Sequence, residues 1–105
     1  MRAVPARLRI VVLAAMSGVI AAEAGAADAI NGQRLYRMHC AACHGGSGQS
    51  VMPMAPSFAR GERLMQPDAN LLASVRLGRN AMPAFVGVLN DREILDAIAF
   101  VRTLR

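Results

Sequence analysis

The sequence predicts an all-α domain made of three helices and one long irregular segment. Apolar residues recur at helical spacing in the stretches 28–39, 68–77 and 90–104. No stretch of four or more residues alternates between apolar and polar, as a half-buried strand would. Residues 45–67 contain too many glycines and prolines for a regular element, so we expect them to form a loop.

The first 26 residues have the three parts of a cleaved secretory signal peptide. Three arginines come first, an apolar run follows at 10–20, and small-x-small cleavage sites lie at 22–24 and 24–26. A retained membrane anchor is the alternative, but the apolar run is short of the about 20 residues that a spanning helix needs. We therefore expect export to the periplasm and a mature domain of residues 27–105.

The composition of the mature chain excludes a nucleic-acid partner and points to a reinforced core. The full chain has a net charge of +5, and removing three arginines and one glutamate with the leader leaves +3. It has no basic run, one Tyr and no Trp, unlike a nucleic-acid-binding surface. A domain of 79 residues (105 − 26) usually needs a disulfide, a metal or a cofactor to complete its core.

The first predicted helix covers residues 28–39. Asp28 is placed to cap it, and Leu35 and Tyr36 supply apolar surface. Gly32 lies inside the helix, where glycine costs about 1 kcal/mol relative to alanine. A glycine at this position indicates the close approach of a second helix.

Directly after this helix comes the motif Cys40-Ala41-Ala42-Cys43-His44. A thioredoxin-like redox pair would need a βαβ pattern, and a zinc site would need two more ligands, although His39 is the only other histidine. C-x-x-C-H is instead the signature of covalent haem attachment. The sequence therefore predicts one haem c, attached through Cys40 and Cys43, with His44 as an axial ligand to the iron.

The irregular segment and the two later helices complete the domain. So long a loop is acceptable if it wraps a large rigid group that replaces the missing core. The third stretch opens at Pro67-Asp68 and is expected to end at Gly78. In the last helix, Asn90 and Glu93 have capping-box spacing. Its apolar stripe is Ile94, Ala97, Ile98, Val101 and Leu104.

The second axial position decides what the haem does. His39 stands next to Cys40, on the wrong side to cross the porphyrin plane. Met82 lies 38 residues after His44, and Pro83 forbids a helix at Met82, which suits a loop that holds a sulfur in place. We therefore expect Met82 to be the second ligand. The remaining methionines of the mature chain, which stay as alternatives, are Met38, Met52, Met54 and Met65.

These features together resemble class I (mitochondrial-type) cytochrome c, especially its short bacterial periplasmic members. The resemblance covers most of residues 30–105. Gly32-x-x-x-Tyr36 is similar to the first-helix pattern of the family, whose aromatic partner on the last helix would here be Phe100. Two further matches are Pro56-Ser57-Phe58-x-x-Gly61 and the methionine-ligand loop Asn80-x-Met82-Pro83-x-Phe85.

The resemblance implies the class I fold, with three to four helices and a long loop around one haem. It also implies that the Pro56 carbonyl accepts the Nδ1–H of His44, which would fix the ring tautomer. The chain departs from the family at Phe58, where an aliphatic residue is usual, and its glycine, Gly61, comes one place late.

His44 and Met82 together would leave the iron no open site. We therefore expect a carrier of single electrons between periplasmic redox proteins or membrane respiratory complexes, with transient contacts, no small-molecule substrate and no catalytic residue. One alternative is a dedicated subunit of a dehydrogenase, oxidase or reductase complex, docked through the Met-rich residues 51–65. Another is a haem enzyme or gas sensor, if Met82 is only a core residue and the sixth site is open.

Overall fold

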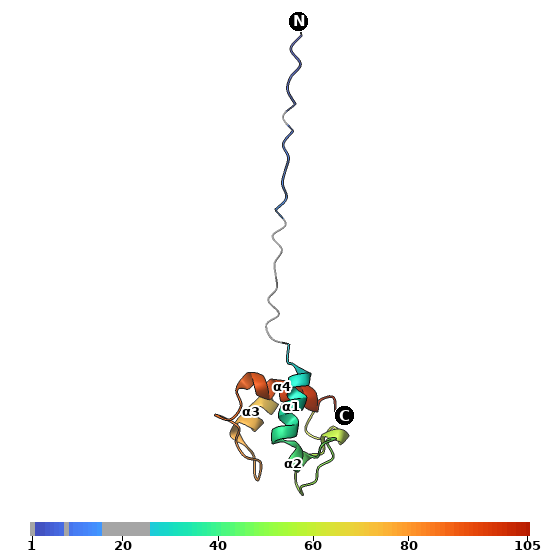
Figure 1. The fold of residues 1–105 in the computed structure, drawn as a ribbon, viewed down its shortest axis with the longest axis vertical. Helices are drawn as coiled ribbons and strands as arrows, with labels where there is room; N and C mark the ends of the chain where they lie inside the picture. Colours follow the sequence, from blue (N-terminus) through green and yellow to red (C-terminus); the bar gives the residue numbers. More distant parts are fainter. Residues whose placement is uncertain (1, 8, 16–25) are drawn as a thin grey trace.

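The computed structural model describes residues 2–7, 9–15 and 26–105, and Figure 1 shows their arrangement. The described residues form four α-helices and one short 3₁₀ helix, with no strand among them, so the predicted all-α class is confirmed. The elements are α1 (Ala29–His39), α2 (Ala41–His44), η1 (Phe58–Arg60), α3 (Asp68–Leu77) and α4 (Asp91–Val101).

The predicted leader falls largely outside the described residues. Positions 1, 8 and 16–25 are not described, and residues 2–7 and 9–15 form no helix or strand. Within the described ranges, no helix is both long and apolar enough to cross a membrane. The signal peptide therefore stays a prediction.

The three predicted helices are α1, α3 and α4. Asp28 caps α1 by accepting hydrogen bonds from the backbone N–H groups of Ile30 and Asn31 at 2.9 and 3.1 Å. The helix α3 ends at Gly78, which has a φ of 74°. The capping box of α4 is present, with Asn90 and Glu93 bonded to each other's backbone.

The helix α4 ends earlier than its apolar pattern predicts. Its last residue is Val101, because the chain turns at Thr103 and Leu104, whose N–H groups bond three residues back. Leu104 nonetheless packs against the core. The two short helices α2 and η1 were not predicted, since four or three residues are too few to show a helical period.

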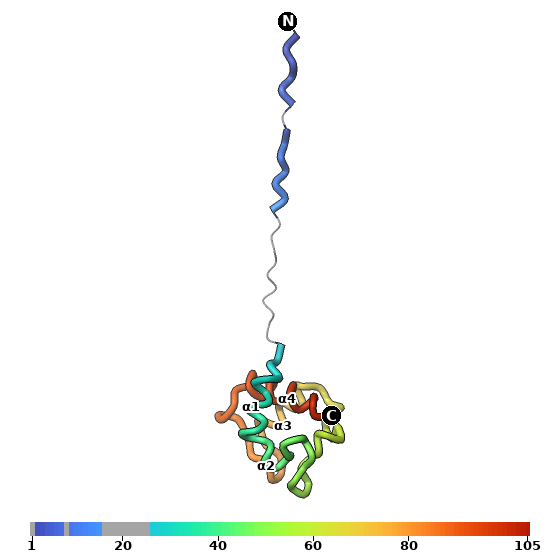
Figure 2. The backbone as a smooth tube through the Cα atoms, turned by 45° about the vertical axis from the view of Figure 1, so that its right-hand side comes forward, coloured from blue at the N-terminus to red at the C-terminus, as the bar shows by residue number. Residues whose placement is uncertain are grey.

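The crossing of α1 over α4 is the main contact of the fold, and Figures 1 and 2 show the two helices side by side. A Cβ atom added to Gly32 would lie 1.8 Å from the Asp96 carbonyl oxygen, which confirms the predicted close approach. The Asp96 carboxylate is buried and accepts from the Asp28 N–H at 2.7 Å and from the Asn31 amide at 2.9 Å. It therefore joins the start of α1 to the middle of α4.

The buried apolar residues form two separate clusters. The larger cluster joins α1 to α4 and to the chain before α4, and its members are Leu35, Phe85, Leu89, Ile94, Ala97 and Ile98. The smaller cluster consists of Tyr36, Leu64 and Val101. Tyr36 connects it to the last turn of α4, because its ring lies 5.3 Å from that of Phe100.

Candidate haem site

One cavity of about 360 Å³ brings together every residue predicted for the site. Its walls come from both apolar clusters, so most of the lining is carbon. The predicted residues that line it are Cys40, Cys43, His44, Pro56 and Met82.

The helix α2 presents the two cysteines and the histidine on a single turn. The backbone N–H groups of Cys43 and His44 both donate to the Cys40 carbonyl, at 3.2 and 3.0 Å. Both thiols are free and partly buried. Burial, followed by the neighbouring Cys43, raises the pKa of Cys40 from 9.0 to about 11, so this thiol is protonated at neutral pH.

The His44 imidazole is buried and held on two sides. Its Nδ1 lies 3.0 Å from the Pro56 carbonyl oxygen, which can only accept, so Nδ1 carries the proton. The Phe58 ring stacks on it at 4.4 Å with an interplanar angle of 16°. The unprotonated Nε2 is then the atom available to a metal.

Met82 belongs to a tight turn that fixes its backbone. The N–H of Arg79 donates to the Met82 carbonyl at 3.0 Å, and the N–H of Met82 donates to the Arg79 carbonyl at 2.9 Å. Asn80 turns the chain with a φ of 53°. The Met82 side chain is half-buried and packs against the larger apolar cluster.

The other candidate ligands are less well held. Met52 and Met54 also line the cavity, but they are 41% and 97% exposed on the loop. Met38 and Met65 are exposed and do not line it. His39 reaches the cavity wall, where its ring packs edge-on against Phe85, with 5.9 Å between the ring centroids.

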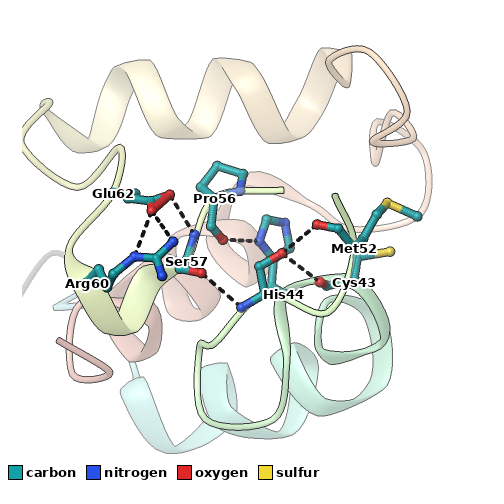
Figure 3. A network of polar contacts seen from close by, with 8 residues as sticks. Cys43, His44, Met52, Pro56, Ser57, Arg60 and Glu62 are labelled. Atoms are coloured by element: carbon teal, nitrogen blue, oxygen red, sulfur yellow. Dashed lines mark hydrogen bonds and ion pairs between the residues drawn. The ribbon is translucent and has the colours of Figure 1, made fainter. Parts of the chain in front are cut away.

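The loop before α3 is fixed by a network of polar contacts beside His44, drawn in Figure 3. The buried Ser57 hydroxyl accepts the Ser50 N–H at 3.0 Å, and the Ser57 N–H donates to the Glu62 carboxylate at 3.0 Å. Arg60 donates to the other oxygen of Glu62 at 2.6 and 3.0 Å. The Ser57 N–H, followed by Arg60, holds the pKa of the Glu62 carboxyl below its ordinary value of 4.5.

The cavity fits a haem better than a bare metal ion. Two thiols, an imidazole and a thioether face an apolar space, which matches the soft ligand set and the macrocycle of haem c. Within the described ranges, no three His, Cys, Asp or Glu side chains gather as a metal site.

Sequence reasoning missed three side chains of this region. Phe58 was noted only as a departure from a family pattern, whereas its ring covers His44. The Tyr36 hydroxyl donates to the Gly45 carbonyl at 2.6 Å and so ties α1 to the end of α2. Glu62 carried no motif, because its partner is a backbone N–H in a loop.

An all-α fold around a cavity that collects a C-x-x-C-H turn and a methionine defines a monohaem c-type cytochrome. Comparison with known families supports this class. Residues 27–101 match the family model described as cytochrome c oxidase, cbb3-type, subunit III.

Individual relatives agree. The chain is 41% identical over 80 residues to cytochrome c6 of Thermosynechococcus vestitus, covering 72% of this chain and 70% of that protein. It is 42% identical over 79 residues to cytochrome c6 of Parathermosynechococcus lividus, covering 71% and 88%. The solved structure of cytochrome c6 from the diatom Phaeodactylum tricornutum superposes with a TM-score of 0.58 at 31% identity, covering 72% of this chain and 92% of that one.

The chain therefore belongs to the cytochrome c family, as a class I monohaem member. It carries one covalently attached haem c and transfers single electrons with redox partners. Its role is that of a carrier and not of a catalyst.

Proposed function

We propose that Cys40 and Cys43 hold the haem through thioether bonds and that His44 and Met82 are its two axial ligands. The observation that carries this proposal is that all four side chains line one cavity, with the Nδ1 of His44 already held by Pro56 at 3.0 Å. Bound in this way, the haem supplies an iron that exchanges one electron without gaining or losing a ligand.

The residues of the chain then have distinct tasks. Pro56 and Phe58 keep the His44 ring in one orientation and one tautomer. The turn Arg79–Met82 keeps the sulfur from leaving, because its backbone is closed by two hydrogen bonds. The apolar walls exclude water, so little rearrangement accompanies the change of charge.

The ligand proposal is tested with Met82→Ala. We expect the ferric variant to lose the weak far-red absorption band typical of iron bound to methionine sulfur, and the ferrous variant to gain carbon monoxide binding. Met54→Ala is the matched control, because Met54 also borders the cavity but is 97% exposed. Persistence of the band in Met82→Ala, or its loss in Met54→Ala, would mean that another side chain is the ligand.

We propose further that residues 1–26 are removed on export and that the mature protein works in the periplasm. The basic and apolar leader supports this, as does the start of the family match at residue 27. The mass of the protein recovered from a periplasmic fraction tests it. A mass that still includes the leader would instead indicate a retained anchor.

The partners that we propose are periplasmic redox proteins or membrane respiratory complexes, met in brief contacts. One observation favours a second role, as the dedicated cytochrome subunit of an oxidoreductase complex. The matching family model is described as a subunit of a cbb3-type oxidase. The exposed Met52, Met54 and Met65 would be the docking residues. Purification from native membranes at low salt separates the two roles, because a subunit remains with its complex and a carrier does not.

A further inference from the structure

The peptide group between Pro56 and Ser57 is hydrogen-bonded at both ends. Its carbonyl oxygen faces the Nδ1 of His44 at 3.0 Å. Its N–H donates to a carboxylate oxygen of Glu62, also at 3.0 Å. Figure 3 shows the resulting chain, which runs from the carboxylate through one peptide group to the imidazole.

A peptide group transmits polarisation because its C–N bond has partial double-bond character. A negative charge at the N–H draws the hydrogen and pushes electron density onto the carbonyl oxygen. The oxygen then becomes a better acceptor, and hydrogen bonds joined in this way strengthen one another. The Nδ1–H bond of His44 is therefore more polarised than it would be with a free peptide.

The Glu62 carboxylate is charged under ordinary conditions, since its pKa lies below the usual value. Its side chain is 42% exposed, and its ion-pair partner Arg60 is 73% exposed. Solvent and salt screen the direct field of such exposed charges. A hydrogen bond at 3.0 Å to the peptide N–H is not removed by salt, so this path stays effective where the direct field is screened.

We propose that Glu62 is a positioning residue for electron transfer, which acts on His44 through the Pro56–Ser57 peptide and lowers the reduction potential of the haem. This inference rests on the proposed role of His44 as axial ligand. An imidazole whose Nδ1–H is pulled toward a carbonyl donates more electron density through Nε2 and thereby favours the ferric state.

The test uses the holoprotein and the variant Glu62→Gln, which keeps the shape of the side chain and an acceptor oxygen but removes the charge. We expect a higher reduction potential that persists at high salt. We also expect the His44 Nδ1–H proton resonance of the ferrous protein to move upfield, which reports a weaker hydrogen bond.

Ser57→Ala is the matched control, because it breaks the other hydrogen bond of the same loop, from the Ser50 N–H, and leaves the Ser57 N–H on Glu62. We expect it to lower the stability of the protein and to leave the potential and the Nδ1–H resonance unchanged. Equal shifts in both variants would mean that loosening of the loop is responsible, and the inference would be overturned.

Two other outcomes would also overturn it. One is an unmoved Nδ1–H resonance in Glu62→Gln, and the other is a potential shift that disappears in high salt, which would indicate a direct field alone. Failure of the ligand proposal is distinguishable, because the wild-type protein would then lack the methionine-ligand band before any variant is compared.

Discussion

Gly32 is the residue on which the crossing of α1 and α4 depends most directly. An added Cβ would meet the backbone oxygen of Asp96 at 1.8 Å, and backbone cannot rotate aside as a side chain can. Overpacking commonly costs 1–3 kcal/mol, so we expect Gly32→Ala to lower the free energy of unfolding by about 3 kcal/mol or more. Urea unfolding of the holoprotein measures this change.

Gly46→Ala is the control for that experiment. No atom lies within 4 Å of the Cβ position at Gly46, and this glycine is not among those with a positive φ. We expect a change of less than about 0.5 kcal/mol, as for an ordinary surface substitution. Similar losses in the two variants would show that the helix crossing tolerates a side chain at position 32.

Tyr36 links the two ends of the attachment region through one hydrogen bond. Tyr36→Phe keeps the contact with Phe100 but leaves the Gly45 carbonyl without its donor. We expect a loss of about 1–2 kcal/mol in the free energy of unfolding, measured by urea titration at neutral pH.

The same residue gives the protein a response to alkaline pH. Burial, followed by Cys40, raises the pKa of Tyr36 from 10.0 to about 12, so the folded state keeps the phenol neutral where the unfolded chain would ionise it. The stabilisation is complete below pH 10.0 and is lost as the pH rises through about 12. Tyr36→Phe should remove this part of the alkaline loss, and an identical pH profile in the variant would contradict the assignment.

At the scale of an element, sequence signals located the helices because their ends are local. Asp28, Gly78 and Asn90 act on backbone groups a few residues away, so each end could be predicted from neighbouring residues alone. The helix α4 stopped short of Leu104 because apolar spacing continues into the turn that follows. The helices α2 and η1 are each about one turn long and leave no period to detect.

The α4 capping box should be worth a measurable part of the stability. Asn90→Ala removes the acceptor for the Glu93 N–H, which lies 2.8 Å from the Asn90 side chain. We expect the free energy of unfolding to fall by about 1 kcal/mol. Asn70→Ala on the exposed side of α3 is the comparison, and there we expect no loss. Thermal unfolding of both variants would reveal equal losses if the cap were unimportant.

The loop elements show where sequence reasoning ends. The motif of α2 and the proline after Met82 predicted site residues that the cavity does bring together. The stacking of Phe58 on His44 and the bond from Ser57 to Glu62 depend on the path of residues 45–67. That path is set by contacts between loop segments, and no periodic pattern encodes it.

At the scale of the whole molecule, the core is divided. Two apolar clusters border a cavity of about 360 Å³, and neither cluster alone is large. An unfilled apolar cavity forfeits packing contacts on every wall. The bound cofactor is therefore expected to be a structural part of the fold as well as its redox centre.

The double variant Cys40→Ala/Cys43→Ala tests this dependence. We expect no covalent holoprotein, together with loss of near-ultraviolet circular dichroism and rapid amide exchange in α1 and α4. Met82→Ala serves as the comparison, because it keeps the attachment and should keep the fold. A cofactor-free double variant with native-like protection would show that the two clusters are sufficient without the haem.

The contact between Asp28 and Asp96 joins residues 68 positions apart. Contacts so distant along the chain form late, because a long loop must first be closed. A nascent chain that lacks residues 91–105 has no partner for the Gly32 face of α1, and the thiols just beyond α1 remain open to reagents. We therefore expect the order of synthesis to set the interval in which Cys40 and Cys43 can react, an interval that closes when the last helix docks.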